Sequence, residues 1–310
     1  MEIERDTNHS IIYSKKARKK EERKLLGIGL IYLLPALILL IVFLFYPILK
    51  TVYFSFFVVK GGGTTEGFVG FQHYKDLIMS PEFRKSMAAT FLFIIYTVPA
   101  EIIISLFLAM IASEKLKGIG FFRTIFSSTL AVSVAAGASI FLFFFDPSVG
   151  ILNHFLGLIG LSGVEWLTSP TWALVSVALT TVWMHIGINF ILLLGGLQNV
   201  SEELYESAKI DGAGYFQRLF KITLPMLSPT LFFVLIIGMI SSFQTFGQID
   251  ILTGGGPANS TNLIVYSIYK EAFAYNNYGF ASAQAIVLFL IILIVTGLQF
   301  RIGEKKVHYQ

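Results

Sequence analysis

The chain has 310 residues, of which 55% are hydrophobic and only 14% are charged, and its mean hydropathy is +0.73. Soluble domains carry about 25% charged residues, so this composition excludes an ordinary soluble protein. The apolar residues come in long blocks rather than in the short alternating patterns of a β-barrel, which predicts an integral membrane protein built from helices. The absence of cysteine excludes disulfides, thiolate metal sites and cysteine nucleophiles.

Six apolar blocks are long enough to cross a hydrocarbon core about 30 Å thick, which takes about 20 helical residues. The six predicted spans are Leu25–Tyr46, Met87–Ala112, Phe121–Phe145, Thr171–Leu194, Leu227–Ile249 and Phe280–Phe300. Prolines and glycines inside them are tolerated where neighbouring helices satisfy the freed backbone groups. The predicted fold class is therefore all-α, with six transmembrane helices.

Lysine and arginine are distributed unevenly between the two sides of these spans. If both termini lie in the cytoplasm, the cytoplasmic segments hold seventeen of them and the outer loops hold six. Basic residues stay preferentially on the cytoplasmic side, so the asymmetry predicts an N-in, C-in topology. Residues 1–24 then form a basic cytoplasmic segment ahead of a membrane domain at 25–310. The run Lys15–Lys24 is interpreted as a topology anchor beside anionic lipid rather than as a nucleic-acid or signalling patch.

A polar, turn-rich loop at about residues 198–226 separates the fourth and fifth spans and is predicted to be cytoplasmic. Ser201 can cap a short helix whose first turn holds two glutamates. Asp211 and Gly212 then predict a turn, with Asp211 capping a second helix, Tyr215–Ile222, that ends at the following Leu-Pro pair. From the residues alone, this hairpin is either an interfacial loop on lipid headgroups or a docking element for a cytoplasmic partner.

The loop matches the pattern E-A-A-x3-G-x9-I-x-L-P, the EAA loop of ABC importer permeases, with one serine in place of an alanine. The matching residues are Glu206, Ser207, Ala208, Gly212, Ile222, Leu224 and Pro225. Three further stretches, “FVGFQHYKDLI”, “FDPSVGILNHFL” and “LTGGGPANSTNLIVYSIYKEAF”, extend the similarity. The chain thus resembles the maltose-type carbohydrate-uptake permease family over nearly all its length, and its “VHYQ” end resembles the glycerol-3-phosphate permease. It departs from some maltose permeases in its short first outer loop, which leaves no room for a large outer domain.

The resemblance implies a six-span permease domain at 25–310 whose loop docks coupling helices into a cleft on a cytoplasmic ATPase. The implied coupling residues are Glu206, Ser207, Ala208, Asp211, Gly212, Ala213, Ile222, Leu224 and Pro225. It also implies a second homologous permease, an ATPase dimer and an extracytoplasmic solute-binding protein in a bacterial or archaeal cell membrane, with no nucleic-acid partner. The chain would bind no cofactor and would not be an enzyme, because the ATPase uses the ATP-Mg. The sequence agrees, since it lacks a G-x-x-x-x-G-K-[ST] phosphate loop.

Polar residues on two spans predict the substrate path, because polar groups in a bilayer are costly unless they meet protein, water or cargo. The predicted path residues are Gly238, Ser241, Ser242 and Thr245 on the fifth span, and Thr181, Met184, His185 and Ile188 on the fourth. Counted without gaps from the EAA loop, these positions match those that line the sugar pocket in the maltose-type family. Helix packing is the alternative for the small and hydroxyl residues, and a packed, hydrogen-bonded side chain is the alternative for His185.

Glu101 is the one acid deep in a predicted span, and such acids can mark proton relays. A proton-coupled secondary transporter would use it without an ATPase, but this class, like a non-transporting membrane scaffold, leaves the EAA pattern unexplained. Pairing with a neighbouring polar group is the other interpretation of Glu101. No lysine or arginine lies deep in any predicted span, which favours a neutral sugar as cargo over glycerol-3-phosphate or its diesters.

Overall fold

The computed structural model describes residues 23–61, 63–114 and 116–303. The basic run ahead of Arg23, Lys115 and the “VHYQ” end lie outside these residues. The chain divides into two compact units, Met1–Phe54 and Ser55–Gln310.

The first unit is described as one helix, Arg23–Phe54, whose 32 residues span roughly 48 Å at 1.5 Å per residue. It extends past the predicted end at Tyr46, through the π-helical segment η1 (Ile41–Phe45) into α2 (Tyr46–Phe54). Pro47 stands in the first turn of α2, directly after the π segment, where the altered hydrogen-bond register suits a residue without an N–H. Apolar residues surround this helix on all sides and are exposed within the unit, as expected of a segment that crosses a bilayer.

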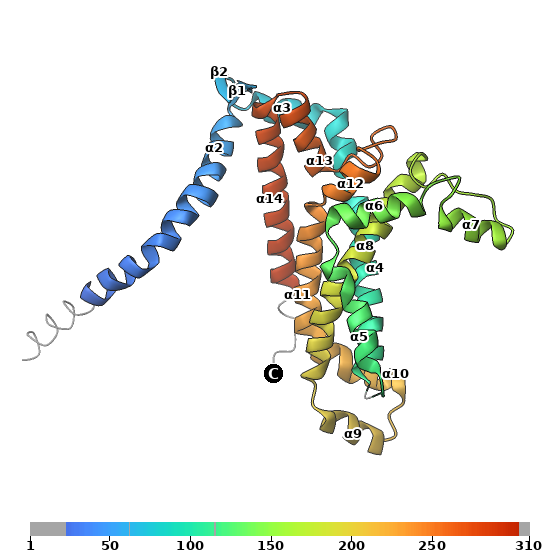
Figure 1. Ribbon diagram of the computed structural model, residues 1–310. Helices are drawn as coiled ribbons and strands as arrows, with labels where there is room; N and C mark the ends of the chain where they lie inside the picture. Colours follow the sequence, from blue (N-terminus) through green and yellow to red (C-terminus); the bar gives the residue numbers. More distant parts are fainter. Residues whose placement is uncertain (1–22, 62, 115, 304–310) are drawn as a thin grey trace, which may run out of the picture. The chain divides into compact units, whose positions relative to one another are not determined.

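The second unit is mostly helical and includes one small β-hairpin (Figure 1). In chain order its elements are β1 (Phe57–Lys60), β2 (Thr64–Phe68), α3 (Gln72–Met79), α4 (Pro81–Ser113), α5 (Ile119–Ser127), η2 (Ser128–Ala131), α6 (Val134–Phe144), α7 (Ile151–Leu158), α8 (Pro170–Gln198), α9 (Glu202–Ile210), α10 (Tyr215–Arg218), η3 (Leu219–Thr223), α11 (Leu224–Phe243), α12 (Gly247–Leu252), α13 (Ile264–Tyr269), η4 (Lys270–Ala274) and α14 (Tyr278–Gly303). The antiparallel pair β1–β2, with a bulge between Val58 and Val59, is a departure from the all-α prediction.

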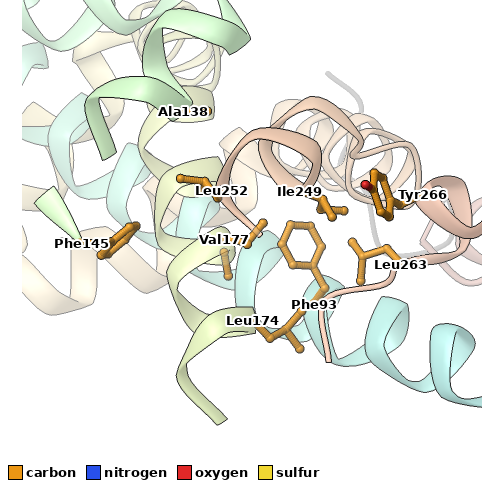
Figure 2. Close-up of a cluster of buried hydrophobic side chains, with 10 residues drawn as sticks. Phe93, Ala138, Phe145, Leu174, Val177, Ile249, Leu252, Leu263 and Tyr266 are labelled. Atoms are coloured by element: carbon orange, nitrogen blue, oxygen red, sulfur yellow. The ribbon is translucent and has the colours of Figure 1, made fainter. Parts of the chain in front are cut away.

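Four long helices, α4, α8, α11 and α14, form the bundle of this unit. α4 packs along α8, and α11 packs against both of them. One buried cluster joins α4, α6, α8, α12 and α13, and Figure 2 shows the Phe93 ring of α4 between Val177 of α8, Ile249 of α12 and Leu263. α9 and α10 lie at one end of the bundle, whereas α3, α13 and the hairpin lie at the other (Figure 1).

The third predicted span, Phe121–Phe145, is not one straight helix. α5 and η2 form a first piece, Ile119–Ala131, and α6 leaves it at an angle of 102°. The Ser133 hydroxyl accepts a hydrogen bond of 3.2 Å from the Ala136 N–H and so caps α6. The single-helix prediction was wrong because an apolar block does not reveal an internal cap. Among the described residues, five helices are long and apolar enough to cross a membrane, or six if this bent pair forms one span.

The fifth predicted span, Leu227–Ile249, is shifted towards the N-terminus in the structure. α10, η3 and α11 form one helix from Tyr215 to Phe243, so the Leu-Pro pair does not end the second loop helix as expected. Pro225 lies in the first turn of α11 directly after the π segment η3, which accommodates the proline ring and its missing N–H. At its other end the helix stops at Phe243, and the short α12 follows.

The stretch “FDPSVGILNHFL” forms a turn after α6. Oδ1 of Asp146 accepts hydrogen bonds from the N–H groups of Ser148 and Val149, at 2.8 and 2.9 Å, and from the Ser148 hydroxyl at 2.8 Å. These bonds, that from Val149 foremost, hold the pKa of Asp146 below its ordinary value. The turn leads into α7, where Asn153 bonds the backbone of Val164.

Candidate functional site: the polar loop and the bundle interior

The polar loop (residues 198–226) forms the first predicted helix as α9, whereas its second predicted helix is the start of the longer helix Tyr215–Phe243. The Ser201 hydroxyl accepts a hydrogen bond from the Glu203 N–H at 3.3 Å and caps α9. Gly212 has a φ of +76°, in the left-handed region that side chains disfavour, so the predicted turn is confirmed. Asp211 is not the cap of the second helix but the C-cap of α9; α10 is capped at Gly214, because the chain needs two more residues to complete the turn.

The implied coupling residues are divided between the exposed surface of this loop and its join to the bundle. Four of them, Glu206, Ser207, Asp211 and Gly212, are exposed. The others, Ala208, Ala213, Ile222, Leu224 and Pro225, are half-buried. Four large apolar or aromatic residues on either side of the turn are each more than half exposed: Ile210, Tyr215, Phe216 and Phe220. We call these four residues the loop patch.

A side-chain hydrogen bond ties α9 to the helix that continues from the polar loop into the bundle as α11. The Tyr205 hydroxyl of α9 lies 3.0 Å from the Thr223 hydroxyl at the end of η3. Beside this contact, a cavity of about 510 Å³ lies between the loop and the nearby ends of α4 and α8. Arg123 of α5 lines the cavity, and its Nε and Nη2 donate to the Ala112 carbonyl of α4 at 2.9 and 2.7 Å.

In the bundle interior, α4, α8 and α11 meet at a polar contact. Nδ1 of His185 on α8 lies 2.8 Å from Oε2 of Glu101 on α4. The Glu101 side chain is completely buried, whereas 26% of the His185 side chain is exposed. Gly238 of α11 is buried against the same carboxyl group, since a Cβ at this position would lie 2.7 Å from Oε1 of Glu101. The polar partner expected for Glu101 is thus His185.

The other predicted path residues of α11 and its continuation lie at or near the end of that helix. Ser242 is buried, and its hydroxyl lies 3.0 Å from that of Thr97 on α4. Ser241 is half-buried and its carbonyl accepts a hydrogen bond from the Thr245 hydroxyl at 3.2 Å. Thr245 follows the end of α11 at Phe243, so the predicted stripe does not continue along one helix to that residue.

The predicted path residues of α8 differ in exposure. Thr181 is buried and donates to the Val177 carbonyl at 2.9 Å, as a packing residue does. Met184 is buried, and its sulfur lies 3.8 Å from Nε2 of Gln248 on α12. His185 and Ile188 are partly exposed within this chain. Of the four predicted path residues on α8, these two are the ones that are not buried within this chain.

Sequence reasoning singled out Glu101 and His185 separately and missed their pairing. The signal that could have paired them was their rarity: Glu101 is the only acidic residue in its predicted span, and His185 is the only histidine in its own. It also missed the contact of Arg123 with Ala112, which leaves no trace in a sequence pattern since a backbone carbonyl accepts the bond.

Residues 77–308 match the family described as binding-protein-dependent transport system inner membrane component. The sn-glycerol-3-phosphate transport system permease protein UgpA of Pectobacterium atrosepticum is 34% identical over 281 residues, which cover 90% of this chain and 95% of the relative. UgpA of Agrobacterium fabrum is 34% identical over 278 residues, covering 89% and 94%.

A solved bacterial ABC transporter involved in the import of the acidic polysaccharide alginate shares the fold. It has a TM-score of 0.78 at 24% identity and covers 94% of this chain and 99% of its own. As the loop pattern predicted, the chain belongs to the family of binding-protein-dependent inner membrane transport components, the ABC importer permeases, and is a multi-pass inner membrane protein.

Proposed function

We propose that this chain forms the translocation path for a sugar-type solute and couples it to a cytoplasmic ATPase through the polar loop. The observation that supports this coupling is the loop patch, a group of four exposed apolar and aromatic residues around the left-handed turn at Gly212. Exposed apolar side chains on a polar loop are costly unless a partner covers them. In an ABC importer that partner is the cleft of the ATPase, and Glu206 on the same loop offers it a charge.

The proposed topology has six spans with both termini in the cytoplasm, the bent pair α5–α6 serving as the third span. This arrangement places α9 and α10 on the cytoplasmic side and α3 and α13 on the outer side. It is supported by the opposite positions of these elements in Figure 1 and by the uneven distribution of lysine and arginine. An outer solute-binding protein would then deliver cargo to the α3 and α13 end.

The proposed mechanism is alternating access in a complex with a second permease, two ATPase subunits and the solute-binding protein. Closure of the ATPase on ATP-Mg would move the polar loop, and the contact between Tyr205 and Thr223 would pass this motion to α11. α11 contacts α4 through Ser242 and Thr97, so the bundle would open towards the docked binding protein. Hydrolysis would reset it. This chain would itself be non-catalytic.

The proposed cargo is a neutral mono- or oligosaccharide. Lysine and arginine on the described long helices of the second unit lie close to their ends, as Arg84, Lys85, Arg218, Lys221 and Arg301 do. His185 is already bonded to the Glu101 carboxyl group, so it is a poor sole counter-charge for a phosphate that carries nearly two negative charges. A sugar needs only hydroxyl, amide and aromatic groups that exchange hydrogen bonds and stack.

Glycerol-3-phosphate is the second candidate, favoured by the 34% identity to the two UgpA proteins. Family membership favours ATP-driven import of either cargo over proton-coupled secondary transport. The test is to purify the full complex in proteoliposomes with its binding protein and to measure ATP turnover with maltotriose, a panel of other neutral sugars and glycerol-3-phosphate. Stimulation by a neutral sugar supports the proposal. Stimulation only by glycerol-3-phosphate or its diesters refutes the neutral cargo but not the importer, and failure of an ATPase to copurify refutes both.

A further inference from the structure

We propose that Glu101 is a positioning residue that holds the ring of His185 in the translocation path, and that Gly238 supplies the space its carboxyl group requires. The proposal rests on the proposed function, because it takes His185 as a residue that meets the solute. It assigns roles to a buried acid and a glycine that the EAA pattern does not explain.

The first support is the isolation of the pair. α8 and α11 carry no other aspartate, glutamate, lysine, arginine or tyrosine, and the remaining acidic and basic residues of α4 lie in its first turns. Among the described residues, His185 is thus the only ionisable side chain that reaches the Glu101 carboxyl group from these helices. A completely buried carboxyl group costs free energy unless it has such a partner.

The second support is the orientation of the imidazole. Its Nδ1 is bonded to Oε2 of Glu101, and no described residue bonds its Nε2. In histidine, the hydrogen bond at one ring nitrogen sets both the orientation of the ring and the role of the other nitrogen. With 26% of the side chain exposed, Nε2 is the ring atom free to exchange a hydrogen bond with a sugar hydroxyl.

The third support is the fit of Glu101 against α11. Oε1 of Glu101 is buried and has no hydrogen-bond partner, and it occupies the space that a Cβ at Gly238 would take, 2.7 Å away. Val98 would lie at an ordinary contact distance of 3.7 Å from the same Cβ, so the carboxyl group of Glu101 is what must move if a side chain is added here. One turn away, the contact of Thr97 with Ser242 fixes α4 against α11 and so fixes this close approach.

The test uses three variants of the full complex in proteoliposomes: Glu101→Gln, His185→Asn and the double variant. The probe is whichever of maltotriose and glycerol-3-phosphate the wild-type complex transports. Glu101→Gln should raise the KM for uptake about tenfold, the size expected for one hydrogen bond to a charged group, and should change the maximal rate less. If Glu101 acts through His185, the double variant should have the KM of His185→Asn alone. Independent effects that multiply in the double variant would overturn the proposal.

A second measurement needs no solute and therefore separates failure of this proposal from failure of the proposed function. Diethyl pyrocarbonate modifies accessible imidazole nitrogens, and mass spectrometry reports the modified fraction of the His185 peptide. In Glu101→Gln the ring loses its carboxylate partner, so we expect His185 in the purified complex to be modified several-fold faster. An unchanged rate would refute the positioning role even if transport were impaired.

Gly238→Ala tests the same contact without altering either member of the pair. The added methyl should displace the carboxyl group and reproduce both the higher KM and the faster modification of His185. The matched control is Gly195→Ala on α8, where a Cβ meets nothing within 4 Å and both readouts should equal those of the wild type. Glu101→Asp, which keeps the charge, should restore part of the loss. A Gly238→Ala complex with wild-type KM and modification rate would contradict the proposed fit.

Discussion

The hydroxyl groups of Tyr205 and Thr223 lie 3.0 Å apart and join α9 to the helix that continues as the fifth span. α10, η3 and α11 form one continuous helix, so in the proposed mechanism a displacement of the polar loop would act directly on the bundle.

Tyr205→Phe should uncouple ATP turnover from uptake without preventing assembly. Removing the hydroxyl deletes one hydrogen bond, worth about 1 kcal/mol, so we expect uptake per ATP hydrolysed to fall about fivefold. The measurement is the ratio of uptake to ATP turnover in proteoliposomes. Tyr32→Phe, on the helix Arg23–Phe54 and outside the polar loop, removes an exposed hydroxyl with no described partner and serves as the control. An unaltered ratio in Tyr205→Phe would show that this bond does not transmit motion.

Gly212→Val should abolish uptake while the chain remains inserted in the membrane. A left-handed φ costs a residue with a side chain about 1–2 kcal/mol, and a β-branched residue more, so the turn between α9 and α10 should open. Gly214→Val is the matched control, because Gly214 has a φ of −68° that any residue adopts. Uptake and ATPase copurification are measured for both variants. Full uptake by Gly212→Val would argue strongly against the coupling role of this loop.

Gly196→Ala should destabilise the crossing of α8 and α11. A Cβ at Gly196 would lie 2.6 Å from side-chain atoms of Leu227 and Thr230 on α11, so these side chains must shift or the helices must separate, at a cost of about 1–3 kcal/mol. The neighbouring Gly195→Ala faces open space and should leave the melting temperature of the purified complex unaltered. Equal melting temperatures for the two variants would mean that the crossing adapts without cost.

Ser241 and Ser242 should respond differently to substitution. Ser242→Ala removes the bond to Thr97 and should lower the thermal stability of the complex by an amount equivalent to about 1 kcal/mol. Ser241→Leu, at a half-buried position, should narrow the path and impair uptake more than it lowers stability. Uptake rates and melting temperatures of both variants check this. If the Ser242→Ala complex were stable and the Ser241→Leu complex unstable, Ser241 rather than Ser242 would be the packing residue.

Cysteine labelling should confirm the proposed topology, since the chain has no cysteine of its own. Cysteines at Lys209, which is exposed on α9, and at Lys20 and Gln310 should react only with reagents that enter the cytoplasm. A cysteine at Asn259, exposed in the loop between α12 and α13, should react from outside. Labelling of Lys209→Cys by an impermeant outer reagent would invert the topology and remove the coupling argument.

Sequence alone determined the class of protein, the approximate spans and the polar loop. In a bilayer a long apolar block can only form a helix, because its backbone N–H and C=O groups must hydrogen-bond to one another within the segment. The turn at Gly212 and the cap at Ser201 are local, since each depends on the conformation of a few neighbouring residues. The EAA pattern is likewise local, so the spacing of residues within one loop was enough to predict the family.

Tertiary structure alone decided the bend between α5 and α6, the continuation of the loop helix through Pro225, and the partner of Glu101. The bend depends on a cap at Ser133 that the hydropathy of the block does not show. The continuation through Pro225 depends on a small change in backbone register, and the partner of Glu101 lies on another helix. Gly238 shows the difference most clearly. From the sequence, Gly238 was one small residue in a polar stripe. Its role depends on the carboxyl group of Glu101 on another helix, which fills the space that a side chain at Gly238 would take.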